Sequence, residues 1–188
     1  TGAMYRAMAL YMIEHKIDVS HLDEVGSACD AITIDIQYSA GEQQVILNGK
    51  NVNDFIRTET VSELSSKISA IPEVREKLLS LQRSLAAAEN VIMDGRDIGT
   101  HVLSNADVKI FLTADAHVRA VRRYEEFIAK GVSCTLENVE REVIERDERD
   151  MNRAIAPLKQ AEDAVRVDTS AMTIEEVVCY LKNLIGQA

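Results

Sequence analysis

The chain is poor in the residues that cross-link, kink or anchor small proteins: it has no tryptophan, two prolines and three cysteines. Cys29, Cys134 and Cys179 lie far apart, and no two of them have the spacing of a CxxC motif or of metal ligands. The sequence therefore predicts reduced thiols in a cytoplasmic protein and argues against a disulfide-rich fold or a zinc domain. No apolar run reaches the length of a membrane span and no signal peptide opens the chain, so we expect no membrane partner.

Positive charge is also scarce. The 188 residues include 31 Asp and Glu against 21 Lys and Arg, which gives a net charge of −10. Nonspecific binding to a nucleic acid polymer needs a basic surface, so this class of partner is not expected. With 46% hydrophobic residues, the chain is long enough for one sizeable core and a small additional domain.

The first half of the chain predicts helices around a small antiparallel sheet. Between Ala31 and Val52 apolar residues alternate with polar ones, and Asn48-Gly49 is a hairpin turn signal, so we expect two or three antiparallel strands there. Ser20 is the expected N-cap of a short helix. Apolar residues at helical spacing, together with a proline at a first helical position, predict helices over 3–14, 20–29, 59–70 and 72–88.

The second half predicts strands and helices in alternation. Val91–Asp94 and Val108–Ala114 are almost purely apolar, which suits strands of a sheet that is covered on both faces. Such alternation is typical of a parallel α/β sheet, so the antiparallel piece is interpreted as an insertion. The remaining elements are a strand over 164–168 and helices over 115–129, capped by Asp115, over 136–152, and after Thr173, which forms a capping box with Glu176.

Two acids and a base, in the stretch Asp94-Gly95-Arg96-Asp97, directly follow the first apolar strand. Ligands of open α/β sheets bind beyond the carboxyl ends of the strands. There, Gly95 lets the backbone approach a ligand closely, and the planar guanidinium of Arg96 suits a phosphate. The alternative is a solvated turn whose charges pair with one another.

A second charged cluster lies in the expected helix over 136–152 and just after it. Arg146, Arg149 and Arg153 recur at i, i+3 and i+7, so they share one helix face with Asp150. This pattern predicts a site for an anion. The alternative is an ordinary exposed helix with ion pairs along it, as alternating charge usually implies.

Further arginines stand in a third cluster, Arg119, Arg122 and Arg123, and alone at Arg6. An acidic protein needs basic clusters where it must hold an anionic ligand against its own field. Arginine forks favour bidentate recognition of phosphate. Separate arginine sites therefore indicate a polyphosphate ligand.

A resemblance to a known family is carried by motifs that follow one another along essentially the whole chain. They are "TGAMYRA" from Thr1, "SKISAIPEVRE" from Ser66, "MDGRDIGT" from Met93, "VKIFLTA" from Val108, "RRYEE" from Arg122, "ERDERDMNRAIAPL" from Glu145 and "AEDAVRVDTS" from Ala161. With these motifs the sequence resembles the bacterial cytidylate kinases, a branch of the nucleoside monophosphate kinases.

The resemblance implies an α/β fold of the P-loop kinase type, with a parallel sheet flanked by helices. It also implies an insertion of antiparallel strands and helices that binds the nucleoside monophosphate, and a helical lid. The implied segments are core over 1–29, 89–120 and 158–188, the insertion over 30–88, and the lid over 121–157.

The resemblance assigns the nucleoside to five residues. Asp97, Ser66 and Arg75 resemble base-reading residues, and Asp97 would accept a hydrogen bond from the exocyclic amine of cytosine. Asp150, oriented by Arg146, resembles the ligand of the ribose hydroxyls.

The resemblance assigns the phosphates to arginines. Those implied to hold the acceptor phosphate are Arg6, Arg96 and Arg153, and those implied to face the donor phosphates from the lid are Arg122, Arg123 and Arg149. Within this set the expected catalytic residues are Arg96, Arg123, Arg149 and Arg153. Asp94 is implied to act near the substrate through the Mg²⁺ shell or local hydrogen bonds, and no residue is assigned as a direct metal ligand.

The implied reaction is in-line transfer of the γ-phosphoryl group of ATP to CMP or dCMP, with Mg²⁺, by a monomeric enzyme. Positioning and charge neutralisation would supply most of the catalysis. Closure of the lid and the insertion would exclude water, which competes as an acceptor.

One motif that the family requires, the phosphate loop G-x-x-x-x-G-K-[ST], is absent from these residues. Gly49-Lys50 is followed by Asn51 in an expected hairpin and does not match. We therefore expect that an N-terminal segment with this loop is missing before Thr1, and that the chain as given is inactive. The alternative is a pyrimidine-nucleotide-binding module without catalysis, or a degenerate kinase paralogue.

Overall fold

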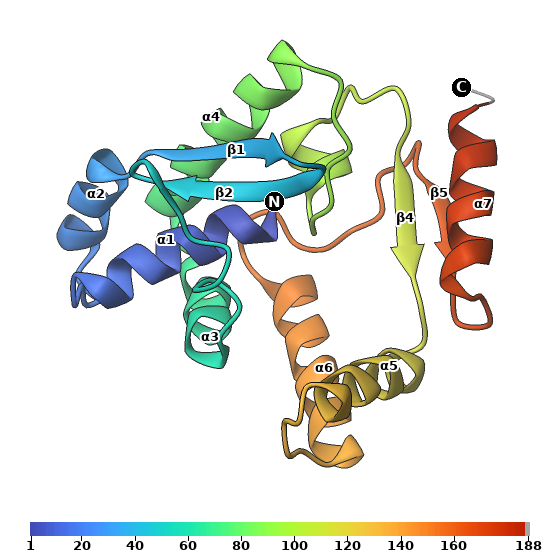
Figure 1. Ribbon diagram of the computed structural model, residues 1–188. Helices are drawn as coiled ribbons and strands as arrows, with labels where there is room; N and C mark the ends of the chain where they lie inside the picture. Colours follow the sequence, from blue (N-terminus) through green and yellow to red (C-terminus); the bar gives the residue numbers. More distant parts are fainter. Residues whose placement is uncertain (187–188) are drawn as a thin grey trace. The chain divides into compact units, whose positions relative to one another are not determined.

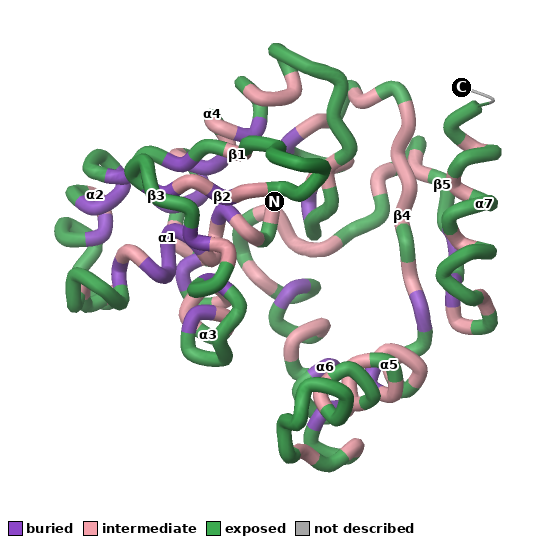
Figure 2. The backbone as a smooth tube through the Cα atoms, viewed as in Figure 1, coloured by how far each residue is buried: buried purple, intermediate pink, exposed green. Residues whose placement is uncertain are grey.

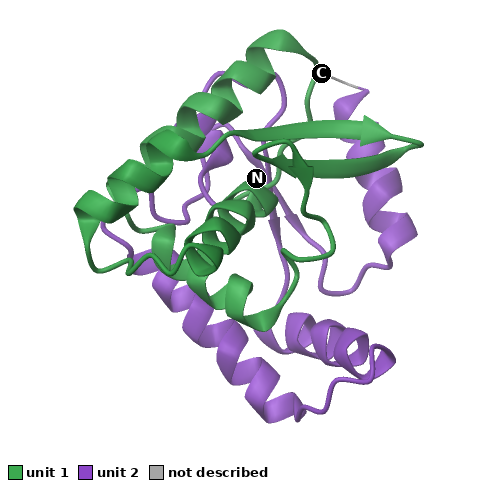
Figure 3. Ribbon diagram, turned by 60° about the vertical axis from the view of Figure 1, so that its left-hand side comes forward, with its two compact units in different colours: residues 1–95 green, residues 96–188 purple. Residues whose placement is uncertain are grey.

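A computed structural model describes residues 1–186, which fall into two compact units, Thr1–Gly95 and the residues from Arg96 onward (Figure 1, Figure 3). The elements of the first unit are α1 Gly2–Glu14, α2 Leu22–Ala31, β1 Ile34–Ser39, β2 Glu42–Leu47, β3 Lys50–Asn51, α3 Glu59–Ile68 and α4 Pro72–Ala88. Those of the second are a π-helical turn η1 Ile98–Val102, β4 Ile110–Thr113, α5 Ala116–Ala129, α6 Leu136–Asn152, β5 Val165–Asp168 and α7 Ile174–Ile185. Among residues 1–186, no helix combines the length and the apolar character needed to cross a bilayer.

The core of the first unit forms around α1. Met4, Met8 and Met12 recur every fourth residue and are buried. Figure 2 shows buried stretches along α1. They share one apolar cluster with Val45 and Leu47, alternate residues of β2 that face the same side of the sheet. Burying these side chains contributes roughly 1.5–3 kcal/mol each, so α1 and the sheet stabilise one another.

The three strands of the first unit form an antiparallel sheet in the order β1–β2–β3. Asn48 and Gly49 join β2 to β3, both with positive φ (47° and 82°), the backbone of a tight hairpin turn. The predicted antiparallel sheet and the helix predicted over 72–88 are confirmed. The predicted cap of the second helix is wrong: α2 begins at Leu22 after His21, and Ser20 lies in the preceding turn, where its hydroxyl donates to Asp18 Oδ1 (2.8 Å).

The second unit contains a parallel pair of strands. β4 pairs with β5, with Leu112 opposite Val167, and this confirms the predicted α/β class with a parallel sheet. Asp115 caps α5 by accepting hydrogen bonds from two backbone amides of its first turn. Thr173 and Glu176 form the predicted capping box of α7. Sequence signals therefore place the helices that leave both strands.

The strand predicted over Val91–Asp94 is wrong. These residues lie in no ladder, and the side chains of Val91 and Ile92 are in contact with solvent, with Ile92 94% exposed. A strand is stable only when a neighbour satisfies its backbone groups, and the two sheets of the described residues, β1–β2–β3 and β4–β5, do not include this segment. The strand predicted over 108–114 is confirmed in a shorter form, Ile110–Thr113.

Candidate functional site: arginine–carboxylate pairs in the second unit

Two buried carboxylates in the second unit are paired crosswise with arginines. Arg96 Nε donates to Asp150 Oδ2 at 2.8 Å, and Arg153 pairs through a terminal nitrogen with Asp97 Oδ1 at 3.4 Å. Asp97 and Asp150 are each 9% exposed. Since Arg96 and Asp97 are neighbours in sequence, the two pairs bind one short segment to the C-terminal end of α6. The structure thus brings together four of the predicted site residues.

Two further contacts fix the geometry of this cluster. Arg146 lies one helical turn before Asp150, with its Nε 4.0 Å from the same carboxylate oxygen. After the helix, Arg153 Nε donates to the carbonyl of Ala156 (2.6 Å), and the amide of Leu158 donates to the carbonyl of Asp150 (2.8 Å). The cluster thus contains three guanidinium groups beside two carboxylates, and guanidinium forks suit a phosphate or another anion.

The arginines predicted to face donor phosphates make different contacts in this structure. One terminal nitrogen of Arg122, on α5, donates to the carbonyls of Thr169 (2.6 Å) and Met172 (3.1 Å), just after β5. Arg123 lies 3.9 Å from a Glu142 carboxylate oxygen and 5.1 Å from the centre of the Phe127 ring. The contacts of Arg122 hold it against backbone carbonyls of the loop that leads into α7.

Arg149 is the third of these arginines, and it lies on the exposed side of α6. Its Nε donates to the carbonyl of Glu145 (3.2 Å) within the same helix. With Glu145, Glu148 and Asn152 it lines an open hollow of about 430 Å³. Two of the four side chains around this hollow are acidic, so it is less suited to an anion than the cluster around Asp150.

The first unit contains the remaining predicted site residues. Arg75 is buried on α4 and donates to the carbonyl of Ser69 (3.1 Å), while the Ser69 hydroxyl donates to the carbonyl of Ser66 (2.7 Å). Ser69, in the turn between α3 and α4, therefore connects the two residues predicted to read the base. Arg6, on α1, donates to the Ser62 hydroxyl (2.7 Å) and to the carbonyl of Ile56 (3.3 Å).

Asp94, the last of these residues, belongs to the segment after α4. Its side chain is 99% exposed, and its carbonyl accepts a hydrogen bond from the Thr1 hydroxyl at 2.6 Å. The carboxylate is therefore open to a ligand or to a hydrated cation.

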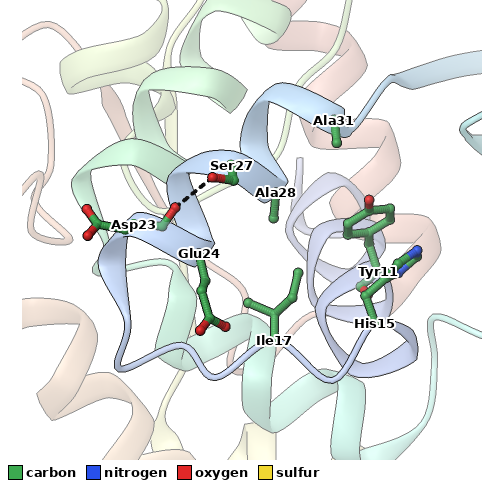
Figure 4. A pocket seen from close by; sticks show the side chains of 8 residues that line it. All are labelled: Tyr11, His15, Ile17, Asp23, Glu24, Ser27, Ala28 and Ala31. Carbon is green, nitrogen blue, oxygen red and sulfur yellow. Dashed lines mark hydrogen bonds between the residues drawn. The ribbon is translucent and has the colours of Figure 1, made fainter.

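An open hollow of about 420 Å³ in the first unit contains none of the predicted site residues (Figure 4). It lies between α1 and α2, and Tyr11 and His15 stack on its wall with ring centres 3.8 Å apart. The Ser27 hydroxyl donates to the carbonyl of Asp23 within α2, as the dashed line of Figure 4 marks. The Ser27 hydroxyl and a ring nitrogen of His15 are each engaged with a backbone carbonyl of their own helix, so neither is directed at a ligand.

Sequence reasoning missed Asp147 of α6 and Lys109. The carboxylate of Asp147 receives two hydrogen bonds from Arg119, at 3.0 and 2.5 Å. Lys109 is almost enclosed and donates to Asp163 (2.5 Å), which lowers the pKa of that carboxyl below its ordinary value. A usable signal existed for Asp147: it follows Val139 and Val143 at intervals of four residues and so extends their helix face.

Fold and site together define an α/β protein with clustered arginines, and comparison with known proteins identifies its class as a kinase, a nucleotide-binding phosphotransferase. A family model described as "Cytidylate kinase" matches residues 1–187. The chain belongs to the cytidylate kinase family.

Individual relatives agree with this assignment along the chain. The cytidylate kinase of Carboxydothermus hydrogenoformans is 49% identical over 100% of this chain and 84% of its own length. That of Lactobacillus johnsonii is 44% identical over 98% of this chain and 80% of its own, and that of Bacillus cytotoxicus 43% identical over 100% and 84%. The resemblance found in the sequence motifs is thereby confirmed at the level of the family.

Proposed function

We propose that this protein transfers the γ-phosphoryl group of ATP to CMP or dCMP, giving CDP or dCDP. The observation that carries the proposal is the arginine–carboxylate cluster of Arg96, Asp97, Asp150 and Arg153, in a chain that belongs to the cytidylate kinase family. A nucleoside monophosphate offers a base amine to a carboxylate and a phosphate to guanidinium forks, so one ligand satisfies both kinds of group.

In this proposal Asp97, Ser66 and Arg75 read the cytosine base. Asp97 presents carboxylate oxygens, which accept from the exocyclic amine of cytosine but not from the carbonyl at the same position of uracil. The hydrogen bonds through Ser69 support joint action of Ser66 and Arg75, because they fix both residues relative to one turn.

The sugar and the acceptor phosphate are assigned to neighbouring groups. Asp150, held by Arg96 and approached by Arg146, accepts from the ribose hydroxyls. Arg6, Arg96 and Arg153 donate to the acceptor phosphate. Arg96 and Arg153 are already paired with the carboxylates of Asp150 and Asp97. The phosphate must therefore compete with these carboxylates for the guanidinium groups, which bind either anion with similar geometry.

Catalysis in this proposal is charge neutralisation and positioning. Arg96, Arg123, Arg149 and Arg153 stabilise the negative charge of the transferring group, and Arg122 contributes to holding ATP. Among residues 1–186 no group of three or more His, Cys, Asp or Glu side chains could hold a metal by itself. Mg²⁺ in such sites is bound mainly by substrate phosphates and water with one or two carboxylates, so the exposed Asp94 fits its outer shell. When bound, Mg²⁺ supplies further neutralisation of phosphate charge.

The division into core, a monophosphate-binding insertion over 30–88 and a lid over 121–157 is part of the proposal, as are a cytoplasmic location and a monomeric state. All of α6 and the larger part of α5 lie within the proposed lid, and the antiparallel sheet lies within the proposed insertion.

The 188 residues contain no G-x-x-x-x-G-K-[ST] loop, so we expect them on their own to bind CMP and to phosphorylate it slowly or not at all. A second candidate, a pyrimidine-nucleotide-binding module without catalysis, is favoured by the same observation. Titration of the protein with CMP tests the acceptor site, and ADP release from ATP, Mg²⁺ and CMP tests transfer. Absence of CMP binding contradicts both candidates, whereas binding with CMP-dependent ADP release, slow or fast, rejects the second.

A further inference from the structure

The two halves of α6 are held by different forces. In the first half, Val139 and Val143 are buried against Ala120 of α5 in a small apolar cluster. In the second half the hydrophobic side chains, Ile144 and Met151, are 42% and 49% exposed. Apolar packing therefore fixes the start of α6 but not the part that contains the proposed nucleotide contacts.

Asp147 continues the inner face of α6 where its apolar residues end. It lies four residues after Val143, so its side chain faces the same way. There it meets Arg119 of α5, whose two terminal nitrogens donate to the two carboxylate oxygens at 3.0 and 2.5 Å. The side chains are 36% and 27% exposed, and this hydrogen bonding raises the pKa of Arg119 above its ordinary value.

Arg119 also extends the connection to the sheet. Its Nε donates to the carbonyl of Ala114 at 2.9 Å, and Ala114 directly follows β4. One guanidinium therefore joins the end of a strand to the middle of α6. Arg146 directly precedes Asp147, and Asp150 follows it by about 4.5 Å of helix rise. A rotation or shift of α6 at Asp147 would displace both of them.

We propose that Arg119 is a positioning residue that acts through Asp147: it fixes the second half of α6 so that Arg146 and Asp150 stand at the nucleotide. This inference rests on the proposed function. Arg119 thus differs from the neighbouring arginines of α5. The two terminal nitrogens with which it could bind a phosphate already donate to the Asp147 carboxylate.

The test is CMP affinity, measured by calorimetric titration, in a double-mutant cycle. Arg119→Lys keeps the charge but loses the fork, and Asp147→Asn keeps the shape but loses the charge. We expect each change to weaken CMP binding roughly tenfold, because small misplacements of contact groups have effects of this order or larger. The double variant should bind no more weakly than either single one. In an Asp150→Asn background, Arg119→Lys should have little further effect.

Arg141→Lys is the matched control. Arg141 lies on the same helix and is 65% exposed, and among residues 1–186 its polar contacts are with Asn138 and Glu145 of α6. We expect unchanged CMP affinity and the same thermal unfolding as the parent. Should Asp147→Asn fail to fold, Asp147→Glu serves instead, since it keeps the charge but shifts the carboxylate by one methylene.

The outcomes separate the inference from the function on which it rests. If the unaltered protein does not bind CMP, the proposed function is rejected, and the inference with it. If the protein binds CMP and Asp147→Asn leaves the affinity unchanged, the inference is overturned. Loss of affinity for ATP but not CMP in Arg119→Lys would also overturn it, because Arg119 would then contact the donor directly.

Discussion

Asp97→Asn changes one atom group at the centre of the proposed acceptor site. The carboxylate is 9% exposed and lies 3.4 Å from Arg153, whose side chain is 11% exposed. Asparagine has similar shape, but its amide presents a donor where the cytosine amine needs an acceptor. The loss of discrimination expected for one base contact is about 1–3 kcal/mol, or roughly five- to 150-fold in affinity. Because Arg153 loses a charged partner, the free energy of unfolding should also fall by about 1–3 kcal/mol.

The assay is calorimetric titration with CMP and UMP at a temperature where both proteins are folded. CMP binding should weaken, and the preference for CMP over UMP should shrink or reverse, since the asparagine amide can donate to the uracil carbonyl. Asp107→Asn, an exposed aspartate of the same unit, is the control and should change neither value. Unaltered CMP affinity in Asp97→Asn would refute the role of Asp97 in reading the base.

Three further predictions address phosphate, pH and the exposed segment. Arg153→Lys should weaken CMP binding but leave cytidine binding nearly unchanged, and equal binding of CMP and cytidine by the unaltered protein would exclude a phosphate clamp. The Lys109–Asp163 pair lowers the pKa of Asp163 in the folded protein, so it should stabilise the protein at pH values above the ordinary aspartate pKa of about 3.9. This stabilisation should be lost as the pH falls through the lower pKa of the folded protein. In chemical denaturation, the free energies of unfolding of Asp163→Asn and the parent should therefore differ at pH 7 and converge in acid. Ile92→Ser should change the free energy of unfolding by less than about 0.5 kcal/mol, because Ile92 is 94% exposed. A loss of several kcal/mol in denaturant unfolding would show instead that Ile92 is buried, as in the strand predicted from the sequence.

Features decided within a few residues could be predicted from the sequence. Asp115 caps α5, Thr173 and Glu176 close the start of α7, and Asn48-Gly49 makes the hairpin turn, because each depends on a side chain and the backbone beside it. The parallel direction of the strands in the second unit could also be predicted, since strand–helix alternation is typical of a parallel sheet, but which strands pair could not.

Features that depend on distant partners could not be predicted in this way. Val91–Asp94 is as apolar as a buried strand, yet a strand exists only with a neighbour, and composition does not supply one. For the charges after it, the alternative to a ligand site is a solvated turn whose charges pair with one another. The structure instead pairs Arg96 and Asp97 with α6, more than fifty residues away. The ion-pair alternative for α6 describes its exposed side, where Arg141 faces Glu145.

The roles of the site residues depend on one further contact, that with the nucleotide. The family resemblance assigned them by position, and the structure adds which of them already bind one another in each unit. It also added Asp147, because only the fold places this carboxylate on the Arg119 fork.

Competitive titration of nucleoside monophosphates is the measurement that tests the central claim most directly. The protein would be titrated with CMP, dCMP, UMP, AMP and GMP at equal ionic strength. The account predicts that CMP and dCMP bind at least about tenfold more tightly than UMP, because the Asp97 carboxylate accepts from the cytosine amine but not from the carbonyl that uracil has in its place. Equal affinity for CMP and UMP, or binding of neither, would contradict it.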